Sequence, residues 1–513
     1  MSNLSGTIKS IQNIMRKDAG VDGDAQRISQ LVWLIFLKIF DDKEKDLEVE
    51  AMMDDREYRS PIPEKLRWRN WADDDEGVTG DALLNFVNNE LFPSLKELHV
   101  HDLRDRGNIV RSVFEDSYNY MKSGTLLRQV INTINKGIDF TKQEERHTFN
   151  DIYEQILKDL QSAGNAGEYY TPRAVTQFAV EMVNPKLGEK VLDPACGTAG
   201  FLVNTIEHIK NTQGIKTAED REALQNGIMG VEKKPLPHML ATTNLILHGI
   251  ELPTIMHDNL LEKSLLDWTS KNRVDVVVTN PPFGGMEEDG VENNFPASYR
   301  TRETADLFLY LIQHVLKPNG RAAVVLPDGT LFGEGVKTRI KEDLLTKCNL
   351  HTIVRLPNGV FNPYTGIKTN ILFFTKGEPT KEVWYFEHPY PEGQKSYNKG
   401  KPINISEFDL EKAWWENREE MSDADPYKKY AWKVSLDELK ARNFNLDVKN
   451  PHTEADDLGT PEELLQKFHE TGAELKKVQA AIISELEEAL KLPSLEGLPA
   501  AGRGLGVGKN QNT

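Results

Sequence analysis

From residue 189 onward the chain alternates between short apolar runs and helix-like segments, and this alternation restricts its fold more than any other feature. The segments EKVLDPACGTAGFLVNTIEHI (189–209) and GIMGVEKKPLPHMLATTNLILHG (227–249) each read as a strand, a turn and a helix. The runs RVDVVVTNPPF (273–283) and GRAAVVLPD (320–328) are strands that are apolar along nearly their whole length. Such strands are buried on both faces, which is typical of a parallel sheet covered by helices. The sequence therefore predicts an α/β fold with a doubly wound, mostly parallel sheet.

Residues 1–150 follow a different pattern, with apolar residues at helical spacing and few alternating runs. They are predicted to form an all-helical domain. Within this domain the run LVWLIFLKIF (31–40) is about half as long as a membrane span, and Lys38 interrupts it. We therefore expect it to form a buried helix.

The rest of the chain is divided by changes in composition. Residues 151–380 carry the strand and helix alternation, and residues 381–455 are polar, aromatic and irregular, so the latter are interpreted as an irregular extension of the core. A charged helix is predicted at 461–490 within a C-terminal segment, 456–495, and a disordered tail at 496–513. Apolar residues recur along this helix at steps of three, four or seven and predict one apolar stripe: Leu465, Phe468, Leu475, Val478, Ile482, Leu486 and Leu490.

The bulk composition excludes several classes of protein. A net charge of −18 argues against a chain that coats nucleic acid by itself, because phosphate contacts need cations. Two cysteines, Cys196 and Cys348, exclude a disulfide framework. The N-terminal segment lacks the apolar core of a signal peptide, and no segment has the length of a membrane span, so we expect a cytoplasmic protein without membrane contact.

Acidic residues stand at the ends of three predicted strands. Asp193 lies where the first strand enters a small-residue turn, in which Gly197 and Gly200 allow a ligand to approach the backbone closely. This turn is not the G-x-G-x-x-G fingerprint, and a carboxylate there would repel a pyrophosphate but suit an amine or a cation. Glu232 ends the next strand, where an acid can accept hydrogen bonds from ribose hydroxyls. Asp258 ends a third, where it can accept from an adenine amino group.

An amine, a ribose and an adenine together describe S-adenosylmethionine, so we expect this cofactor at the common edge of the strands. Each acid by itself would more often cap a helix or face water, and only three in succession with the glycine turn favour the cofactor. The loop NAGEYYTPRAV (165–175) is expected to cover the methionine end. In this loop Thr171 is predicted to be the N-cap of a helix, with Pro172 at the first helical position.

The strand at 273–279 delivers Asn280, Pro281, Pro282 and Phe283 to the same edge. The side chain of Asn280 and the backbone carbonyl of Pro281 can accept both hydrogens of a planar amino group. This draws the nitrogen toward tetrahedral geometry and frees its lone pair to attack a methyl group. Phe283 offers a flat face on which a base can stack, and a base in a duplex must be extruded to reach it. The simpler alternative is a turn that only ends the strand.

Three motifs resemble those of a known family. DPACGTAGFL (193–202), NPPF (280–283) and GEYYTPR (167–173) look like motifs I, IV and X of amino-methyltransferases that act on adenine in DNA. With the helical N-terminal domain, ETADLFLYLIQHVLKPNGRAAVVLPDG (303–329), NFNLDVKNPH (443–452) and the terminal helix, nearly the whole chain resembles the modification subunit (HsdM) of type I restriction–modification systems.

The resemblance implies a Rossmann-like core of the S-adenosylmethionine-dependent methyltransferases and transfer of a methyl group to N6 of a flipped adenine. It implies no metal, catalysis by Asn280, Pro281, Pro282 and Phe283, and cofactor contacts from Glu168, Tyr169, Tyr170, Thr171, Asp193, Pro194, Gly197, Thr198, Gly200, Glu232 and Asp258. Two positions depart from the family: Ala199 stands where it usually has Gly, and His257 where it often has Gly. The first makes the turn tighter, and the second weakens the assignment of Asp258.

The resemblance also implies partners. In the family, two modification subunits join one DNA specificity subunit, and a restriction subunit can add a nuclease and translocase. Because a sequence-reading domain needs about 100 to 200 residues of its own, we expect recognition of double-stranded DNA to come from the specificity subunit, docked on the apolar stripe of 461–490. Four cations could touch DNA, although most are expected to be solvated: Arg173, Lys337, Arg339 and Lys368.

Two other classes of function remain open at this stage. An Asn-Pro-Pro-aromatic motif also serves methylation of amino groups in RNA and in protein, although such enzymes are usually shorter. A non-catalytic subunit that keeps the fold only for assembly is a further alternative, which the presence of Asn280 and Asp193 disfavours.

Overall fold

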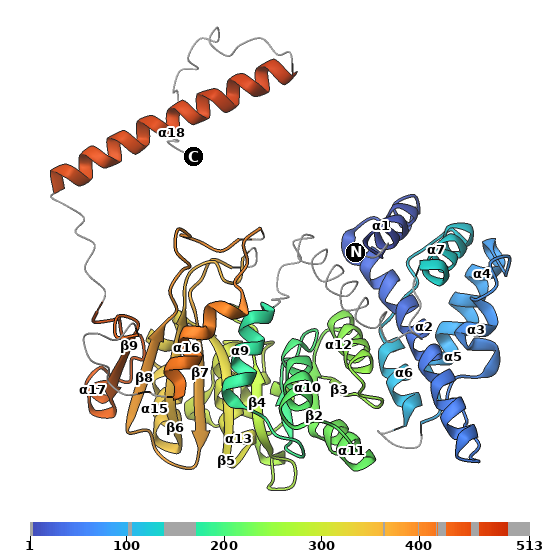
Figure 1. Cartoon of the computed structure of the whole chain (residues 1–513), viewed down its shortest axis with the longest axis horizontal. Helices are drawn as coiled ribbons and strands as arrows, with labels where there is room; N and C mark the ends of the chain where they lie inside the picture. Colours follow the sequence, from blue (N-terminus) through green and yellow to red (C-terminus); the bar gives the residue numbers. More distant parts are fainter. Residues whose placement is uncertain are drawn as a thin grey trace, which may run out of the picture. The chain divides into compact units, whose positions relative to one another are not determined.

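The computed structural model describes residues 4–100, 105–137, 171–362, 365–398, 400–416, 418, 427–452 and 461–490. The chain divides into two compact units, residues 1–452 and 453–513 (Figure 1). The first unit contains a group of helices and a mixed sheet, and the second contains one long helix. The predicted tail, 496–513, lies outside the described residues.

The described N-terminal residues are helical. The helices are α1 (Leu4–Met15), α2 (Asp24–Met53), α3 (Trp68–Trp71), α4 (Gly80–Phe86), α5 (Phe92–Lys96), α6 (Arg106–Phe114) and α7 (Gly124–Gly137). Residues 31–40 are all buried in α2, as predicted, and Lys38 is held there by Asp42 at an Nζ–Oδ2 distance of 3.4 Å. A helix that is apolar on every side must lie inside a bundle. None of the described helices combines the length and apolar character needed to cross a membrane.

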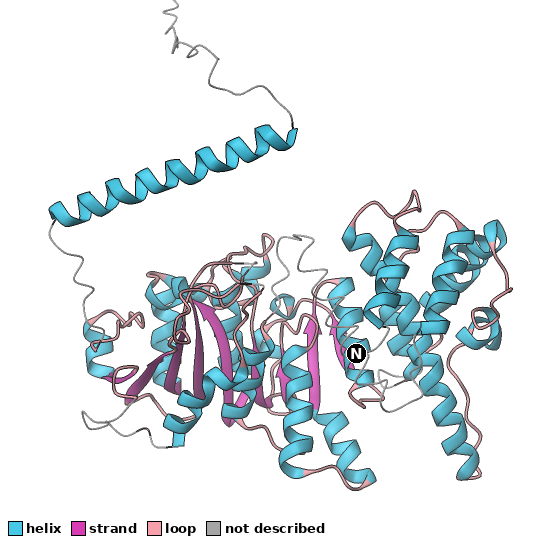
Figure 2. Cartoon of the chain, turned by 45° about the horizontal axis from the view of Figure 1, so that its top comes forward, coloured by secondary structure: helices cyan, strands magenta, loops and turns pink. Residues whose placement is uncertain are grey.

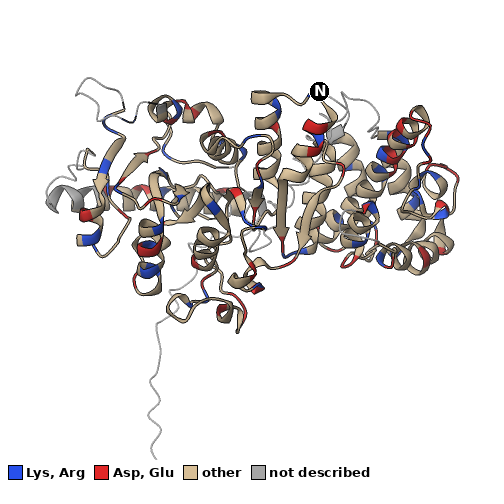
Figure 3. Cartoon of the chain, turned by 90° about the horizontal axis from the view of Figure 1, so that it is seen from below, with Lys and Arg blue, Asp and Glu red and all other residues tan. Residues whose placement is uncertain are grey.

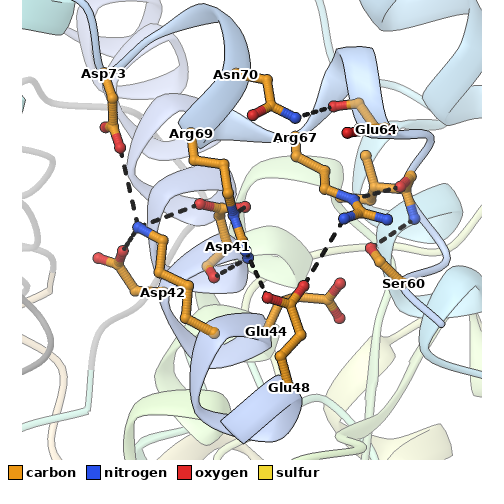
Figure 4. A network of polar contacts seen from close by, with 12 residues as sticks. Asp41, Asp42, Glu44, Glu48, Ser60, Glu64, Arg67, Arg69, Asn70 and Asp73 are labelled. Atoms are coloured by element: carbon orange, nitrogen blue, oxygen red, sulfur yellow. Dashed lines mark hydrogen bonds and ion pairs between the residues drawn. The ribbon is translucent and has the colours of Figure 1, made fainter. Parts of the chain in front are cut away.

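A buried network of charges fastens α2 to α3 (Figure 4). Arg69 donates from Nε to Asp41 Oδ1 at 2.9 Å and from Nη1 to Glu48 Oε2 at 2.7 Å. Lys45 Nζ lies 3.0 Å from Asp42 Oδ1 and 3.5 Å from Asp41 Oδ2. Burial raises the pKa of Asp41, and the charges of Arg69 and Lys45 oppose that rise. The network therefore offsets part of the free-energy cost of burying the Asp41 carboxylate.

The sheet has nine described strands in the order β3-β2-β1-β4-β5-β7-β6-β8-β9. The strands are β1 (Val191–Asp193), β2 (Ile228–Glu232), β3 (Thr254–His257), β4 (Val274–Thr279), β5 (Leu316–Pro327), β6 (Cys348–Leu356), β7 (Thr369–Lys376), β8 (Glu382–Glu387) and β9 (Ala431–Ser435). Neighbours from β3 to β5 are parallel, as are β6 and β8, whereas β7 is antiparallel to both of its neighbours and β9 is antiparallel to β8.

Helices cover both faces of this sheet (Figure 2). They are α9 (Arg173–Val183), α10 (Gly200–Gln213), α11 (Ala218–Gly227), α12 (Pro235–Leu247), α13 (Thr304–Val315), α14 (Asp328–Phe332), α15 (Val336–Lys347), α16 (Asp409–Glu416) and α17 (Leu436–Ala441). Alternate residues of β4 enter different cores, with Val276 and Val278 in the core of α9 and α10 and Val277 in that of α13 and α15. The predicted doubly wound α/β fold is confirmed.

The interpretation of residues 381–455 as irregular is wrong. Strands β8 and β9 in this segment extend the central sheet, and α16 and α17 pack against it. Trp414 is fully buried and Trp384 is only 9% exposed. The strand sequence EVWYFE has aromatic residues on both faces, so it lacks the alternation that marks a half-buried strand.

Helix α12 joins the two parts of the first unit. Met239 and Leu240 belong to the core of the helical domain, and Ala241 and Leu245 belong to a core of the sheet. At the loop before β3, Arg106 Nη1 donates to the carbonyl of Glu251 at 3.4 Å. The helical domain therefore packs against the end of the sheet that β2 and β3 form.

The second unit contains α18 (Pro461–Leu490), which spans the residues predicted to be helical. Its apolar stripe is exposed in this unit, with exposures between 52% for Ile482 and 73% for Phe468. The side chain of Leu490 lies outside the described residues.

We expect Arg69→Ala to lower the free energy of unfolding by about 3–5 kcal/mol at pH 8, because it leaves Asp41 buried without its main partner. The loss should shrink as the pH falls, since a carboxyl with a raised pKa becomes neutral on acidification and then needs no cation. Urea unfolding followed by circular dichroism measures both effects. The control is Arg59→Ala, which removes an exposed pair with Glu57 and should change little. Equal losses in the two variants would show that the network does not stabilise the bundle.

Candidate active site

The four residues expected at strand ends lie at one edge of the sheet. Asp193 and Glu232 are the last residues of β1 and β2, and Asp258 and Asn280 directly follow β3 and β4. These four strands are parallel and adjacent, in the order β3-β2-β1-β4. Their carboxyl ends therefore meet at the same edge, where sheets of this kind bind ligands.

The turn after β1 is shaped by two residues with left-handed backbones. Gly197 has φ +53°, and a Cβ built on it would meet no heavy atom within 4 Å. The space in front of this glycine is therefore open. Ala199 has φ +66° and is fully buried, so its methyl group fits, in a backbone conformation that strains a residue with a side chain. Helix α10 begins directly after it, at Gly200.

Asp193 is buried at the centre of this edge, with 1% of its surface exposed. Its Oδ1 accepts hydrogen bonds from the Thr279 hydroxyl at 2.7 Å and from the Ala195 amide at 3.2 Å. Burial raises the pKa of Asp193 to about 7, and the nearby Glu232 adds to the rise, while the two hydrogen bonds oppose it. The site therefore holds a carboxyl group that no cation among the described residues neutralises.

Glu232 ties the turn to the next strand. Its Oε2 accepts from the Gly197 amide at 2.9 Å, and its Oε1 accepts from the Lys234 amide at 2.8 Å. Both carboxylate oxygens thus face backbone amides around the open space at Gly197. The position of this acid fixes the turn and the start of α12 together.

Asp258 lies beside a shallow cavity of about 370 Å³. Its Oδ1 accepts from the Asn259 amide at 2.8 Å, and its Oδ2 pairs with Lys263 at 2.8 Å. The preceding His257 stacks on His238, with ring centroids 4.9 Å apart, and its Nε2 lies 3.2 Å from the Lys233 carbonyl. The imidazole therefore contacts His238 and the Lys233 carbonyl rather than the Asp258 carboxylate. The cavity is lined by Glu115, Asp116, Lys233, Pro235, His257, Asp258, Asn259 and Glu262.

The two ends of the Asn280 side-chain amide have different surroundings. Its Nδ2 donates to the Thr171 hydroxyl at 2.8 Å, whereas its Oδ1 is buried and has no hydrogen-bond partner among the described residues. Pro281 is buried and Pro282 is exposed. Phe283 is only 3% exposed and makes an edge contact with Phe361, at 6.2 Å between ring centroids. The edge thus combines a buried acid, an open glycine turn and an unpaired amide oxygen.

Comparisons with known proteins show the family of the chain. A family described as N-6 DNA methylase matches residues 144–458, and one described as the HsdM N-terminal domain matches residues 4–134. The chain belongs to the N-6 DNA methylase family. Its relatives include the methylase subunit of the type I restriction enzyme EcoEI from Escherichia coli, which is 60% identical over 95% of this chain and 98% of that protein. The StySPI methylase subunit from Salmonella potsdam is 31% identical over 72% of this chain and 68% of that protein.

Two solved structures that resemble this chain also come from type I systems. A modification subunit assigned to a type I restriction enzyme from Vibrio vulnificus YJ016 has a TM-score of 0.79 and 45% identity, over 88% of this chain and 97% of that one. A chain from a study of complex assembly and conformational transition in a type I system has a TM-score of 0.76 and 37% identity, over 96% and 99% of the two chains.

This member of the N-6 DNA methylase family is therefore the methylase subunit of a type I restriction–modification system and an adenine-specific DNA methyltransferase. The family implies S-adenosylmethionine as the methyl donor. The match favours DNA over RNA or protein as the acceptor of the methyl group, and an enzyme over a subunit that serves only assembly.

The prediction that Thr171 caps a helix is wrong. Helix α9 begins at Arg173 and Pro172 occupies the cap position, so Thr171 lies one residue before the cap. The hydroxyl is instead the acceptor of the Asn280 amide, 109 residues away. Glu168, Tyr169 and Tyr170 lie outside the described residues. Pro194 is buried and Thr198 is partly buried in the turn after β1, where the Thr198 carbonyl accepts from Asn244.

Sequence reasoning missed two residues that shape this edge of the sheet. Thr279 donates a hydrogen bond to Asp193 from the neighbouring strand. Its position directly before NPPF is a sequence signal by which it could have been predicted. Asn244 donates from α12 to the Thr198 carbonyl at 3.0 Å. Nothing in the local sequence marks this asparagine, because the contact joins positions 46 residues apart.

The cations named as candidates for DNA contact differ in their surroundings. Lys337, expected to be solvated, instead pairs with the buried Asp306 at 2.8 Å and also contacts Glu303. Arg339 donates from Nε to the Ser298 carbonyl at 2.5 Å, and Lys368 is exposed. Basic and acidic side chains are interspersed along the described helices (Figure 3). Arg173, Arg339 and Lys368 are exposed and fit the expected solvated surface, whereas Lys337 does not.

We expect the isosteric change Asp193→Asn to raise thermal stability at pH 8 and to raise it by less at pH 5. The raised pKa means that the folded state keeps a proton between about pH 4 and pH 7 that the unfolded state loses. The wild-type carboxyl therefore opposes folding increasingly as the pH rises through that range. Thermal unfolding at both pH values measures the difference. The exposed control Asp22→Asn should follow the wild type, and a variant less stable than the wild type at pH 8 would contradict the interpretation.

Proposed function

We propose that the carboxyl edge of β3-β2-β1-β4 binds S-adenosylmethionine and presents it to an adenine held at Asn280. The bound cofactor supplies an electrophilic methyl group on a sulfonium. The unpaired Oδ1 of Asn280, buried with no partner among the described residues, is the single observation that carries the proposal. A buried acceptor without a partner costs free energy and calls for a ligand that supplies the missing hydrogen bond.

The residues around the first turn fit the cofactor. The space in front of Gly197 is open, so Gly197 and Gly200 leave room for the methionine part, with Pro194 and Thr198 in the same turn. Asp193, with its raised pKa, gains from a cation or an amine placed beside it. Thr171 and the segment Glu168–Tyr170 before it would cover this end.

The two acids further along the edge fit the nucleoside part. Glu232 lies between the open turn and the start of α12, where it can accept from ribose hydroxyls in addition to the amides of Gly197 and Lys234. Asp258 borders the cavity and is 40% exposed, which leaves it accessible to an adenine amino group. Its pairing with Lys263 competes for the same carboxylate, so its share in the affinity should be the smaller of the two.

The target adenine enters from the DNA. Asn280 Oδ1 and the Pro281 carbonyl would accept the two hydrogens of the N6 amino group and so free the nitrogen lone pair to attack the methyl carbon. The new nitrogen–carbon bond would form as the carbon–sulfur bond breaks, the sulfur would leave as a thioether, and the nitrogen would lose one proton to water. The base must leave the duplex to reach this point. Phe283 is covered, at 3% exposure, so stacking on it requires Phe283 or its neighbour Phe361 to move. Pro282 is exposed and lies on the route of the base.

We expect Asn280→Ala to reduce methyl transfer to duplex DNA by at least about 100-fold, because it removes the side-chain acceptor of the amino group. Cofactor affinity should stay within a few-fold, since Asn280 acts on the base. Tritiated methyl transfer and isothermal titration measure the two quantities in the assembled complex. Asn211→Ala, an exposed change on α10, serves as the control. Methyl-transfer activity within a few-fold of the wild type would contradict the amino-group mechanism.

Recognition of the DNA sequence is proposed to come from a separate specificity subunit, in a complex that also contains a second copy of the modification subunit. A restriction subunit can join this complex. The exposed stripe on α18 supports this role, because apolar residues with exposures of 52% to 73% need a partner helix to cover them. The relative with a TM-score of 0.76 comes from a study of complex assembly, which is consistent with such a surface.

We expect Ile482→Glu to weaken binding to the specificity subunit by at least about tenfold, because it places a charge in the middle of the apolar stripe. The matched control is Ser484→Glu, which adds the same side chain to the opposite side of α18. The dissociation constant of the two purified subunits, measured by biolayer interferometry, gives the comparison. Equal affinities for the two variants would refute the docking role of the stripe.

A further inference from the structure

We infer that Thr171 is a positioning residue that sets the direction of the Asn280 amide for catalysis. The inference rests on the proposed role of Asn280 as the acceptor of the adenine amino group. Its basis is the hydrogen bond from Asn280 Nδ2 to Thr171 Oγ1 at 2.8 Å, together with the unpaired, buried Oδ1 at the other end of the same amide.

The direction of this amide decides whether the reaction can occur. An asparagine side chain has an acceptor oxygen at one end and an NH2 group with two donor hydrogens at the other. The adenine amino group brings hydrogens of its own, so only the oxygen end can accept them. A rotation of the amide by half a turn would place one NH2 group against another. Asn280 therefore needs a partner that holds its NH2 group away from the base.

Thr171 is the partner that the structure gives to this NH2 group. Its hydroxyl oxygen accepts the hydrogen bond, and Asn280 has no other side-chain partner among the described residues. The two residues come from different elements, since Thr171 precedes α9 and Asn280 follows β4. The bond thus depends on how α9 packs against the sheet.

The position of Thr171 is fixed by the helix that follows it. Pro172 restricts the backbone of the residue before it to extended conformations. The Pro172 carbonyl accepts from the amides of Val175 and Thr176, at 2.9 and 3.1 Å, and so begins α9. Val175 and Phe178 are fully buried in the core between α9 and the sheet. The Thr171 hydroxyl is therefore held in place by a packed helix. The β-branched side chain of Thr171 also has few accessible rotamers.

The test compares three side chains at this position in the assembled complex. Thr171→Val keeps the shape and removes the hydroxyl, whereas Thr171→Ser keeps the hydroxyl and removes the methyl group. We expect Thr171→Val to lower the single-turnover rate of methyl transfer by about 100-fold, the size of effect that a misplaced reacting group produces. The KM for DNA should change less than about threefold, because the base-binding surface is intact. The dissociation constant for S-adenosylmethionine should rise by much less than the rate falls, because Thr171 is only one of the residues proposed to cover the cofactor.

Thr171→Ser should recover the rate to within about fivefold of the wild type, since the acceptor oxygen returns. Thr212→Val, which removes an exposed hydroxyl bonded only within α10, is the matched control and should keep the full rate. Three results would overturn the inference: a Thr171→Val enzyme with the wild-type rate, a Thr171→Ser enzyme as slow as Thr171→Val, or a rate loss matched by equal losses of cofactor affinity and thermal stability.

The Asn280→Ala enzyme separates failure of the positioning role from failure of the proposed mechanism. If Asn280→Ala is inactive and Thr171→Val is fully active, only the positioning role fails. If Asn280→Ala keeps its activity, the proposed mechanism fails, and with it the reason for orienting the amide.

Discussion

The hydrogen bond from Thr279 to Asp193 is the interaction on which the architecture of the site depends. It joins the ends of β4 and β1, two adjacent parallel strands, at 2.7 Å inside the protein. Glu232 extends the connection to the end of β2 by accepting from the Gly197 amide. Three strand ends are thus held together by short polar contacts, so the proposed cofactor turn and the proposed catalytic asparagine keep a fixed relation.

The same edge contains three features that are energetically unfavourable when no ligand is bound. Asp193 is a buried carboxyl whose pKa is raised to about 7, Ala199 has a left-handed backbone, and Asn280 has an unpaired oxygen. Each of these features lowers the stability of the folded chain, and the packed cores on both faces of the sheet compensate for them. Concentrated at one edge, they fit the proposed binding of a cationic cofactor and an amino group there.

The helical domain supports this edge from one side. Helix α12 starts beside Glu232, whose carboxylate accepts from the Lys234 amide, and then contributes side chains to the core of the helical domain. Arg106 adds a contact to the loop before β3. The two acids proposed for the nucleoside part of the cofactor therefore belong to elements that the helical domain contacts, whereas Asn280 lies on the opposite side of β1.

The sequence by itself determined the features that depend on local patterns. Continuous apolar strands, the motifs at their ends, the buried helix at 31–40 and the helix at 461–490 follow from periodicity and turn residues over a few positions. Only the tertiary structure decided which distant groups meet. In the structure, Thr171 accepts a hydrogen bond from the Asn280 amide instead of capping a helix, and Lys337 pairs with Asp306. Strands β8 and β9 also belong to the sheet. The physical reason is that hydrogen bonds and ion pairs between remote residues depend on how elements pack, and local spacing carries no record of that packing.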